Sequence, residues 1–267
     1  MTQKKQYTKK HFGQNFLVNP RIIERILSAI DPSQNDTILE IGAGEGAITY
    51  PLLERGVNVL AVEKDPELID RLQVSGLART GRLKLIPQDV LKLKTADLAG
   101  VNKVVGNIPY NISTPIVEWL ITNRFCLSKV FLMTQLEFGE RLTAKPFTKD
   151  YGALSCLAQY YADLEILFRI PNTSFFPVPK VTSCFLKISF RVPKLQALDE
   201  KLLFKVTQMA FSNRRKKISN ALETFFKHET LLKALEDCQL DPQLRPDQMT
   251  VEDYVRLINR LAADKKI

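Results

Sequence analysis

The chain has 267 residues, of which 45% are hydrophobic and 25% are charged, and a formal net charge of +9. This length allows one domain of ordinary size plus a small second one, and the composition is that of a globular protein. No apolar run approaches the roughly 20 residues of a membrane span. No apolar stretch follows the positive charges of the N-terminus, as a secretory signal requires. We therefore expect a cytoplasmic protein without a membrane anchor.

The positive charge is concentrated at the two ends of the sequence. Residues 1–30 carry a net charge of +5, residues 31–185 a net charge of −1, and residues 186–267 again +5. Basic ends around a nearly neutral body favour a catalytic core flanked by surfaces for a polyanion, nucleic acid above all. The alternative is that the lysine-rich ends are simply solvated.

Metal binding is not indicated by the cysteines. The four cysteines lie far apart, show no Cys-x-x-Cys spacing and are accompanied by two histidines. We expect reduced core thiols and no metal site.

The first part of the chain combines a basic arm with an aromatic motif. Lys9 and Lys10 belong to the arm and are expected to contact RNA phosphates. Residues 13–17, Gly-Gln-Asn-Phe-Leu, suit a segment that packs over a site better than a disordered tail, which would leave phenylalanines in water. A helix is predicted from Pro20 to Ile30, where apolar residues recur at helical spacing.

A predicted strand at 36–41 runs into the glycine loop Gly42-Ala43-Gly44-Glu45-Gly46. Such a loop lets the backbone approach a ligand and presents amides at a helix N-terminus. Its Gly-x-Gly-x-Gly spacing differs from the Gly-x-Gly-x-x-Gly of dinucleotide enzymes. Glu40, before the loop, would repel a pyrophosphate but suit a positively charged ligand. The stretch therefore favours S-adenosylmethionine over NAD.

Acidic residues end the next two predicted strands. Glu63 ends the strand at 57–63, in a position where a carboxylate accepts hydrogen bonds from a ribose. Asp89 ends the strand at 83–89 and could accept a hydrogen bond from the adenine amine of the cofactor, or could instead cap a turn.

The fourth predicted strand leads into Asn107-Ile108-Pro109-Tyr110. The Asn107 side-chain oxygen and a main-chain carbonyl, which we place at Ile108, could accept both hydrogens of an adenine amine and favour the tetrahedral nitrogen of a transition state. Pro109 stiffens this backbone, and Tyr110 would stack on the ring. Alone, the four residues could equally be a turn. The polar ends of three successive strands favour the catalytic interpretation, because parallel sheets bind ligands at that edge.

The same criteria predict helices at 113–122, 136–144 and 152–161 and strands at 129–134, 164–170 and 181–190. The last two strands are joined by a proline-rich connection. Phe175 in this connection would close the other face of an extruded base, opposite Tyr110. Inward packing as a core residue is expected of Phe176 and is the alternative for Phe175. Lys180 would meet phosphate.

Beyond residue 190 the pattern is wholly helical, with helices predicted at 199–211, 214–226, 229–237 and 251–263. We expect a catalytic domain at residues 1–190 and a small helical RNA-contacting domain at residues 191–267. Arg214 and Lys217 would share one helical face. Together with Arg215 they are predicted to contact RNA phosphates, although a solvated face is the alternative.

Taken together, these motifs resemble the ribosomal RNA adenine dimethyltransferase family. The matching stretches follow the family's order over nearly the whole chain and comprise Gly13–Leu17, Glu40–Gly46, Glu63, Asp89, Asn107–Tyr110 and Phe175–Val181. The resemblance implies an α/β fold with the Rossmann-like sheet of class I S-adenosylmethionine-dependent methyltransferases, mostly parallel with its last strand antiparallel, and a small all-helical C-terminal domain. Glu45 departs from the apolar or small residue that is frequent at its variable position.

The resemblance also implies an activity and the residues that serve it. The expected reaction is dimethylation of the exocyclic N6 amine of two adjacent adenosines in a hairpin near the 3′ end of small-subunit ribosomal RNA. The expected partner is an immature small ribosomal subunit, bound by a monomer. Contacts with S-adenosylmethionine are expected from Asn15, Leu17, Gly42, Gly44, Glu63, Asp89 and Asn107.

Three alternatives remain open at this stage. An Erm-type enzyme, which methylates large-subunit RNA, shares the fold and the amine-binding motif. A non-catalytic RNA-binding assembly factor on the same fold could have lost Asn107, Tyr110 or Glu63, yet all three are present. A DNA adenine methyltransferase usually carries a larger domain for reading base sequence.

Overall fold

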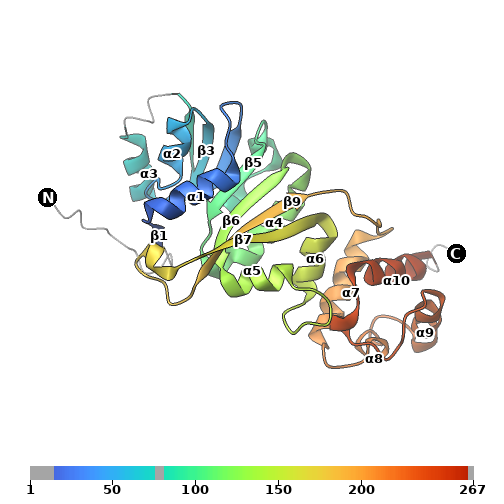
Figure 1. Cartoon of the computed structure of the whole chain (residues 1–267). Helices are drawn as coiled ribbons and strands as arrows, with labels where there is room; N and C mark the ends of the chain where they lie inside the picture. The colour runs from blue at the N-terminus through green and yellow to red at the C-terminus, as the bar shows by residue number, and fades with distance from the viewer. Residues whose placement is uncertain (1–14, 76–80, 264–267) are drawn as a thin grey trace. The chain divides into compact units, whose positions relative to one another are not determined.

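The computed structural model describes residues 15–75 and 81–263 and is built around a seven-stranded sheet (Figure 1). The strand order is β4-β3-β2-β5-β6-β9-β7. Its strands are, in chain order, β2 Thr37–Ile41, β3 Asn58–Glu63, β4 Leu83–Pro87, β5 Lys103–Asn107, β6 Lys129–Gln135, β7 Ala162–Ile170 and β9 Ser183–Phe190.

The five strands from β4 to β6 are parallel, and β9 runs antiparallel to β6. The central strands are short apolar runs because both faces of a parallel sheet are covered by its crossover helices. Val59, Val104 and Val130 accordingly lie in the core. The α/β fold with an antiparallel last strand, predicted from the sequence, is confirmed.

The helices α1 to α4 flank this sheet (Figure 1). They span Pro20–Ile30, Thr49–Glu54, Pro66–Gln73 and Ser113–Thr122, and α5 spans Leu136–Thr143. Helix α1 begins as its sequence predicts, since the Asn19 side chain accepts hydrogen bonds from the first backbone amides and Pro20 occupies the first turn. Its buried face consists of Ile26, Leu27 and Ile30.

A second, two-stranded sheet joins the start of the described chain to the proline-rich connection. Strand β1, Phe16–Leu17, pairs antiparallel with β8, Phe175–Phe176. Phe16 lies opposite Phe176, and Leu17 lies opposite Phe175. This pairing fixes the aromatic N-terminal motif against a segment about 160 residues away in the sequence.

The chain divides into two compact units. The first contains the residues up to Gly139 and Glu165–Phe190, and the second contains Glu140–Leu164 and the residues from Arg191 onward. Residues Glu140–Leu164 thus group with the C-terminal helices rather than with the catalytic domain expected at 1–190. The reason is apolar packing within the second unit, where the rings of Tyr160 and Tyr161 contact Phe204.

The helices of the second unit are α6 Ala153–Tyr161, α7 Glu200–Ser212, α8 Ile218–Ala221, α9 His228–Asp237 and α10 Val251–Ala263. The helix predicted at 214–226 is wrong. The chain turns at Asn213–Lys216, and α8 is four residues long. The backbone N–H of Ile218 donates to the carbonyl of Leu244, which ties this segment to a distant loop instead of to a preceding helical turn.

In residues 15–75 and 81–263, no helix is long and apolar enough to span a bilayer. The same ranges hold no cluster of three or more His, Cys, Asp or Glu side chains suited to a metal ion. All four cysteines are free, three of them are buried, and Cys126 is half-buried.

Candidate active site

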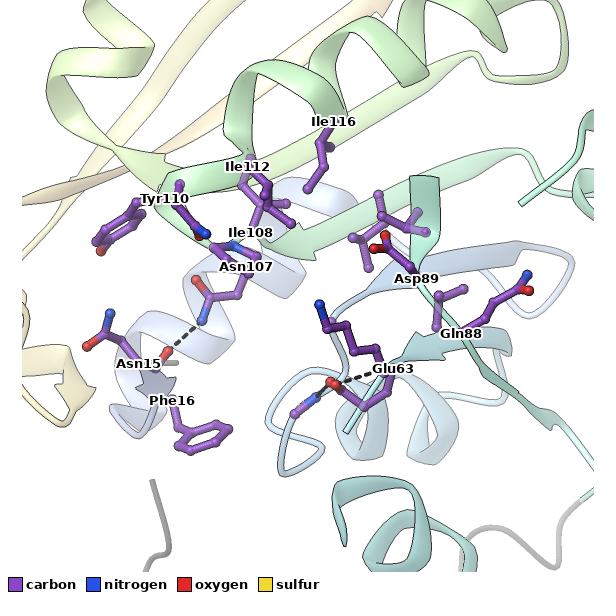
Figure 2. A pocket seen from close by; sticks show the side chains of 18 residues that line it. Asn15, Phe16, Glu63, Gln88, Asp89, Asn107, Ile108, Tyr110, Ile112 and Ile116 are labelled. Carbon is purple, nitrogen blue, oxygen red and sulfur yellow. Dashed lines mark hydrogen bonds between the residues drawn. The ribbon is translucent and has the colours of Figure 1, made fainter. Parts of the chain in front are cut away.

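A cavity opens at the carboxyl ends of the parallel strands β2, β3, β4 and β5, with about 1020 Å³ of empty space that includes its opening to solvent. Its lining comprises Asn15, Phe16, Ile41, Gly42, Gly44, Val62, Glu63, Lys64, Gln88, Asp89, Val90, Asn107, Ile108, Pro109, Tyr110, Asn111, Ile112 and Ile116. Five segments remote in sequence therefore converge on one hollow (Figure 2). This is the edge at which open parallel sheets bind ligands.

The glycine loop forms one wall of the cavity. Gly42 and Gly44 have φ angles of 72° and 58°, a region that side chains disfavour. A Cβ atom on Gly44 would lie 3.2 Å from the ring of Phe16, and one on Gly42 would lie 3.5 Å from the Asn107 carbonyl oxygen. The loop therefore needs glycine both for its backbone conformation and for the close approach of β1.

Glu63 holds the glycine loop in place. Its carboxylate accepts hydrogen bonds from the backbone N–H of Gly44 at 3.0 Å, of Lys64 at 2.8 Å and of Asp65 at 3.0 Å. The side chain is buried and faces the cavity (Figure 2). A buried carboxylate satisfied by backbone amides is a fixed acceptor site for a ligand.

Glu40 lies deeper, in a smaller hollow that continues the site behind the glycine loop and is also lined by Leu17 and Gly106. Burial raises the pKa of Glu40 to about 8, and the negative charge of Glu63 acts in the same direction. A 2.6 Å hydrogen bond from the Thr49 hydroxyl opposes this rise. A positively charged ligand group beside this carboxyl would lower its pKa again, because an opposite charge favours the carboxylate.

A hydrogen bond to the backbone of Asn15 orients the Asn107 side chain. Its side-chain nitrogen donates to the Asn15 carbonyl at 2.8 Å, as Figure 2 shows. Because the amide nitrogen is used in this way, the side-chain oxygen is the atom left to accept from a ligand. The backbone N–H of Ile108 donates to the Met133 carbonyl, which anchors the next residue to β6.

Tyr110 and Asp89 occupy opposite sides of the same cavity (Figure 2). The Tyr110 hydroxyl shares a 2.8 Å hydrogen bond with the Ser183 hydroxyl, and burial raises the pKa of Tyr110 above its usual value. The Asp89 carboxylate accepts from the backbone N–H of Leu91 at 3.0 Å and so caps a short 3-10 turn. Both interpretations offered for Asp89 are therefore compatible with its position, because a carboxylate has further acceptor sites.

Comparison with known proteins identifies the family. The family described as ribosomal RNA adenine dimethylase matches residues 5–263. A relative from Moorella thermoacetica, named ribosomal RNA small subunit methyltransferase A, is 38% identical over 95% of this chain and 92% of its own. A relative of the same name from Pseudomonas aeruginosa is 39% identical over 95% of this chain and 94% of its own. The chain belongs to the ribosomal RNA adenine dimethylase family.

Two solved structures share the fold over nearly their whole length. A dimethyladenosine transferase from Plasmodium falciparum is 24% identical with a TM-score of 0.80, over 94% of this chain and 98% of its own. The 23S rRNA methyltransferase ErmE is also 24% identical with a TM-score of 0.72, over 93% of this chain and 100% of its own. The Rossmann-like methyltransferase fold is thus established for this member of the dimethylase family.

The aromatic pair of the proline-rich connection is reversed relative to its prediction. Phe175 is 2% exposed and packs in the core with Leu17, whereas Phe176 is 44% exposed. The reason is the pairing of β8 with β1: neighbouring residues of a strand point to opposite faces, so Phe175 joins Leu17 on the core side and Phe176 joins Phe16 on the other. In this structure Phe175 does not offer its ring to a base.

The residues predicted to contact RNA differ in their surroundings. Lys180, Arg215 and Lys217 are exposed. Arg214 is half-buried and is paired with Asp247 at 3.2 Å, so it serves the packing of the second unit. Lys9 and Lys10 lie outside the described residues. The shared helical face proposed for Arg214 and Lys217 is wrong, because the segment is a turn.

Several residues of the site were not singled out from the sequence. Ser183 fixes the ring of Tyr110, and Thr49 fixes Glu40. Ile112 and Ile116 supply apolar lining from the start of α4. None of these side chains has a sequence signature, because each acts through a neighbour or through shape. Before the structure, the one indication of their role is that some of them lie close in sequence to the glycine loop or to Asn107–Tyr110.

Proposed function

We propose that this protein transfers methyl groups from S-adenosylmethionine to the N6 amine of two adjacent adenosines in a hairpin near the 3′ end of small-subunit ribosomal RNA. The family and the names of relatives at 38–39% identity support the reaction and the small subunit. We further propose that the protein acts as a monomer on an immature small subunit in the cytoplasm.

The chemistry of the groups that line the cavity supports S-adenosylmethionine as the donor. The glycine loop lines the cavity with its backbone, and fixed carboxylates stand at the ends of β3 and β4. We assign the ribose to Glu63, the adenine amine to Asp89 and the positively charged amino group to the hollow at Glu40. Backbone groups of Asn15, Leu17, Gly42 and Gly44 would complete the binding. When bound, the donor supplies a methyl group on a positively charged sulfur.

The chain's own residues would bind and orient the target amine. The Asn107 side-chain oxygen and the Ile108 carbonyl accept the two amine hydrogens, which favours the tetrahedral nitrogen that forms during attack. Tyr110, held by Ser183, stacks on the ring of the extruded base. Alignment and these acceptors suffice, since the amine becomes acidic once methylated and can lose its proton to water.

The observation that carries the proposal is the orientation of the Asn107 amide by Asn15. In Asn107→Ala we expect methyl transfer to immature small subunits to fall by roughly 100-fold or more, because a preorganised acceptor is lost. Binding of S-adenosylmethionine, measured by calorimetry, should be largely retained.

Asn111→Ala is the matched control, because Asn111 is an exposed amide that lines the same cavity. It should keep close to full activity. Normal turnover in Asn107→Ala, or an equal loss in both variants, would contradict the assignment.

A further inference from the structure

The loop between α5 and α6 presents an aromatic ring to solvent on a strained backbone. Phe147 is 68% exposed and has a φ of 68°. Among the described residues, two other non-glycine residues have positive φ, Asp31 at the end of α1 and Gln239 just beyond α9. Such conformations are common where helices end, but Phe147 is not at a helix end, and bulky residues rarely adopt them.

This conformation is held by contacts within the second unit. The backbone N–H of Phe147 donates to the Asp247 carbonyl at 2.7 Å. Arg214 donates to the Thr148 carbonyl at 2.9 Å and pairs with the Asp247 carboxylate. Tyr151, at the end of the loop, is fully buried and packs edge-on against Phe211. The loop is therefore clamped at its base while its ring points outward.

Exposed cations lie close to Phe147 in the sequence and next to Arg214, which binds its loop. Lys145 and Lys149 flank Phe147 in the loop, and both are exposed. Arg215 and Lys217 are exposed and lie close in sequence to Arg214, which donates a hydrogen bond to the loop at Thr148. We call these five residues, Lys145, Phe147, Lys149, Arg215 and Lys217, the Phe147 surface. Asp150 is also exposed nearby, and the exposed Lys216 lies 4.0 Å from Glu223, so the surface is mostly but not wholly positive.

Both features of Phe147 oppose stability. An apolar ring in water gains nothing from burial, and a positive φ is unfavourable for a bulky residue because its Cβ atom comes too close to the backbone. Glycine would fit the backbone better. An exposed ring among cations is the arrangement by which proteins hold single-stranded nucleic acid, where bases stack on the ring and phosphates meet the charges.

We propose that Phe147 stacks on an unpaired base of the RNA, outside the catalytic cavity, while the cations of the Phe147 surface contact its phosphates. Arg214 is a positioning residue, because it holds the loop rather than the RNA. The inference rests on the proposed function in that the RNA substrate is what this surface binds. It adds a second contact, with a base that is not methylated.

The test measures binding of the full-length protein to labelled oligouridine, which is unpaired and contains no adenine to enter the catalytic cavity. Phe147→Ala should weaken binding by about tenfold or more, as loss of one base–aromatic stack predicts. Phe147→Trp should restore it. Binding to a fully paired RNA duplex of the same length should change little, because its bases are already stacked.

Phe125→Ala is the matched control, since Phe125 is also an exposed phenylalanine, 84% exposed, with the Arg124 guanidinium 4.2 Å from its ring. It should bind oligouridine normally. Phe147→Gly relieves the positive φ and should keep the melting temperature, so its loss of affinity would not reflect unfolding.

Unchanged affinity in both Phe147→Ala and Phe147→Gly would overturn the proposal, as would an equal loss in Phe125→Ala. A defect on protein-loaded small subunits with normal oligouridine binding would also overturn it, in favour of a protein contact. Failure of the proposed function is separate, because it would remove methyl transfer while leaving the effect of Phe147 on oligouridine binding intact.

Discussion

At the scale of single residues, the carboxyl group of Glu40 stands out beside the site because burial raises its pKa far above the usual value. Its pKa rises from 4.5 to about 8 on burial. Between these values the folded protein holds a proton that the unfolded chain has released, so stability falls as pH rises from about 4.5 to 8. Above pH 8 the destabilisation stays constant.

Glu40→Gln should therefore raise the melting temperature, because a neutral amide keeps an acceptor for Thr49 without this penalty. The gain should be small near pH 5 and grow to roughly 5 °C or more at pH 8. Thermal unfolding of both proteins across this pH range measures it. A gain that does not change with pH would contradict the raised pKa.

The sequence largely predicted which residues line the site where those residues come at the ends of parallel strands. Glu63, Asp89 and Asn107 follow apolar strands, and the parallel topology brings such positions to one edge. The roles of Phe175 and Phe176 were not predictable in the same way. Which ring faces the core depends on the register of β8 against β1, and a one-residue shift reverses the faces.

At the scale of elements, the glycine loop and β1 form one structural unit, since the ring of Phe16 lies against Gly44. Gly44→Ala should lower the free energy of unfolding by about 1 kcal/mol for its φ of 58°, and by more because the new methyl group meets that ring. Affinity for S-adenosylmethionine should fall as well, which calorimetry and thermal unfolding can measure together.

Gly81→Ala separates the cost of the positive φ from the cost of the contact with the Phe16 ring. Gly81 also has a positive φ, 73°, but a Cβ atom there would meet nothing within 4 Å. Gly81→Ala should lower the free energy of unfolding by the cost of the positive φ alone and leave the affinity for S-adenosylmethionine unchanged. Equal effects of the two substitutions would indicate that the contact between Phe16 and the loop is unimportant.

Elements with a clear apolar pattern were predicted well, and those that depend on distant partners were not. Strands β3 and β6 are continuous apolar runs bounded by polar residues, so their bounds follow from the sequence. The segment at 214–226 has helical residues too, yet it turns at Asn213–Lys216. Its backbone bonds to Leu244 and the ion pair of Arg214 with Asp247 are tertiary contacts that local propensity does not contain.

At the scale of the whole molecule, two compact units share one basic chain. The cavity, with Glu63, Asp89, Asn107 and Tyr110 around a single hollow, belongs to the first unit. The Phe147 surface belongs to the second. The clustering of basic residues at both ends of the sequence predicted contact with nucleic acid, and membership of an RNA-modifying family agrees with it. The assignment of Glu140–Leu164 to the second unit depends on long-range packing and was not predictable from composition.

The most direct test of the central claim is mass spectrometry of nucleosides from RNA incubated with the protein and isotopically labelled S-adenosylmethionine. Immature small subunits and naked large-subunit RNA serve as the two substrates. We predict labelled N6,N6-dimethyladenosine in the small-subunit RNA and none above background in the large-subunit RNA. Label confined to large-subunit RNA, or absent from both, would contradict the proposed function.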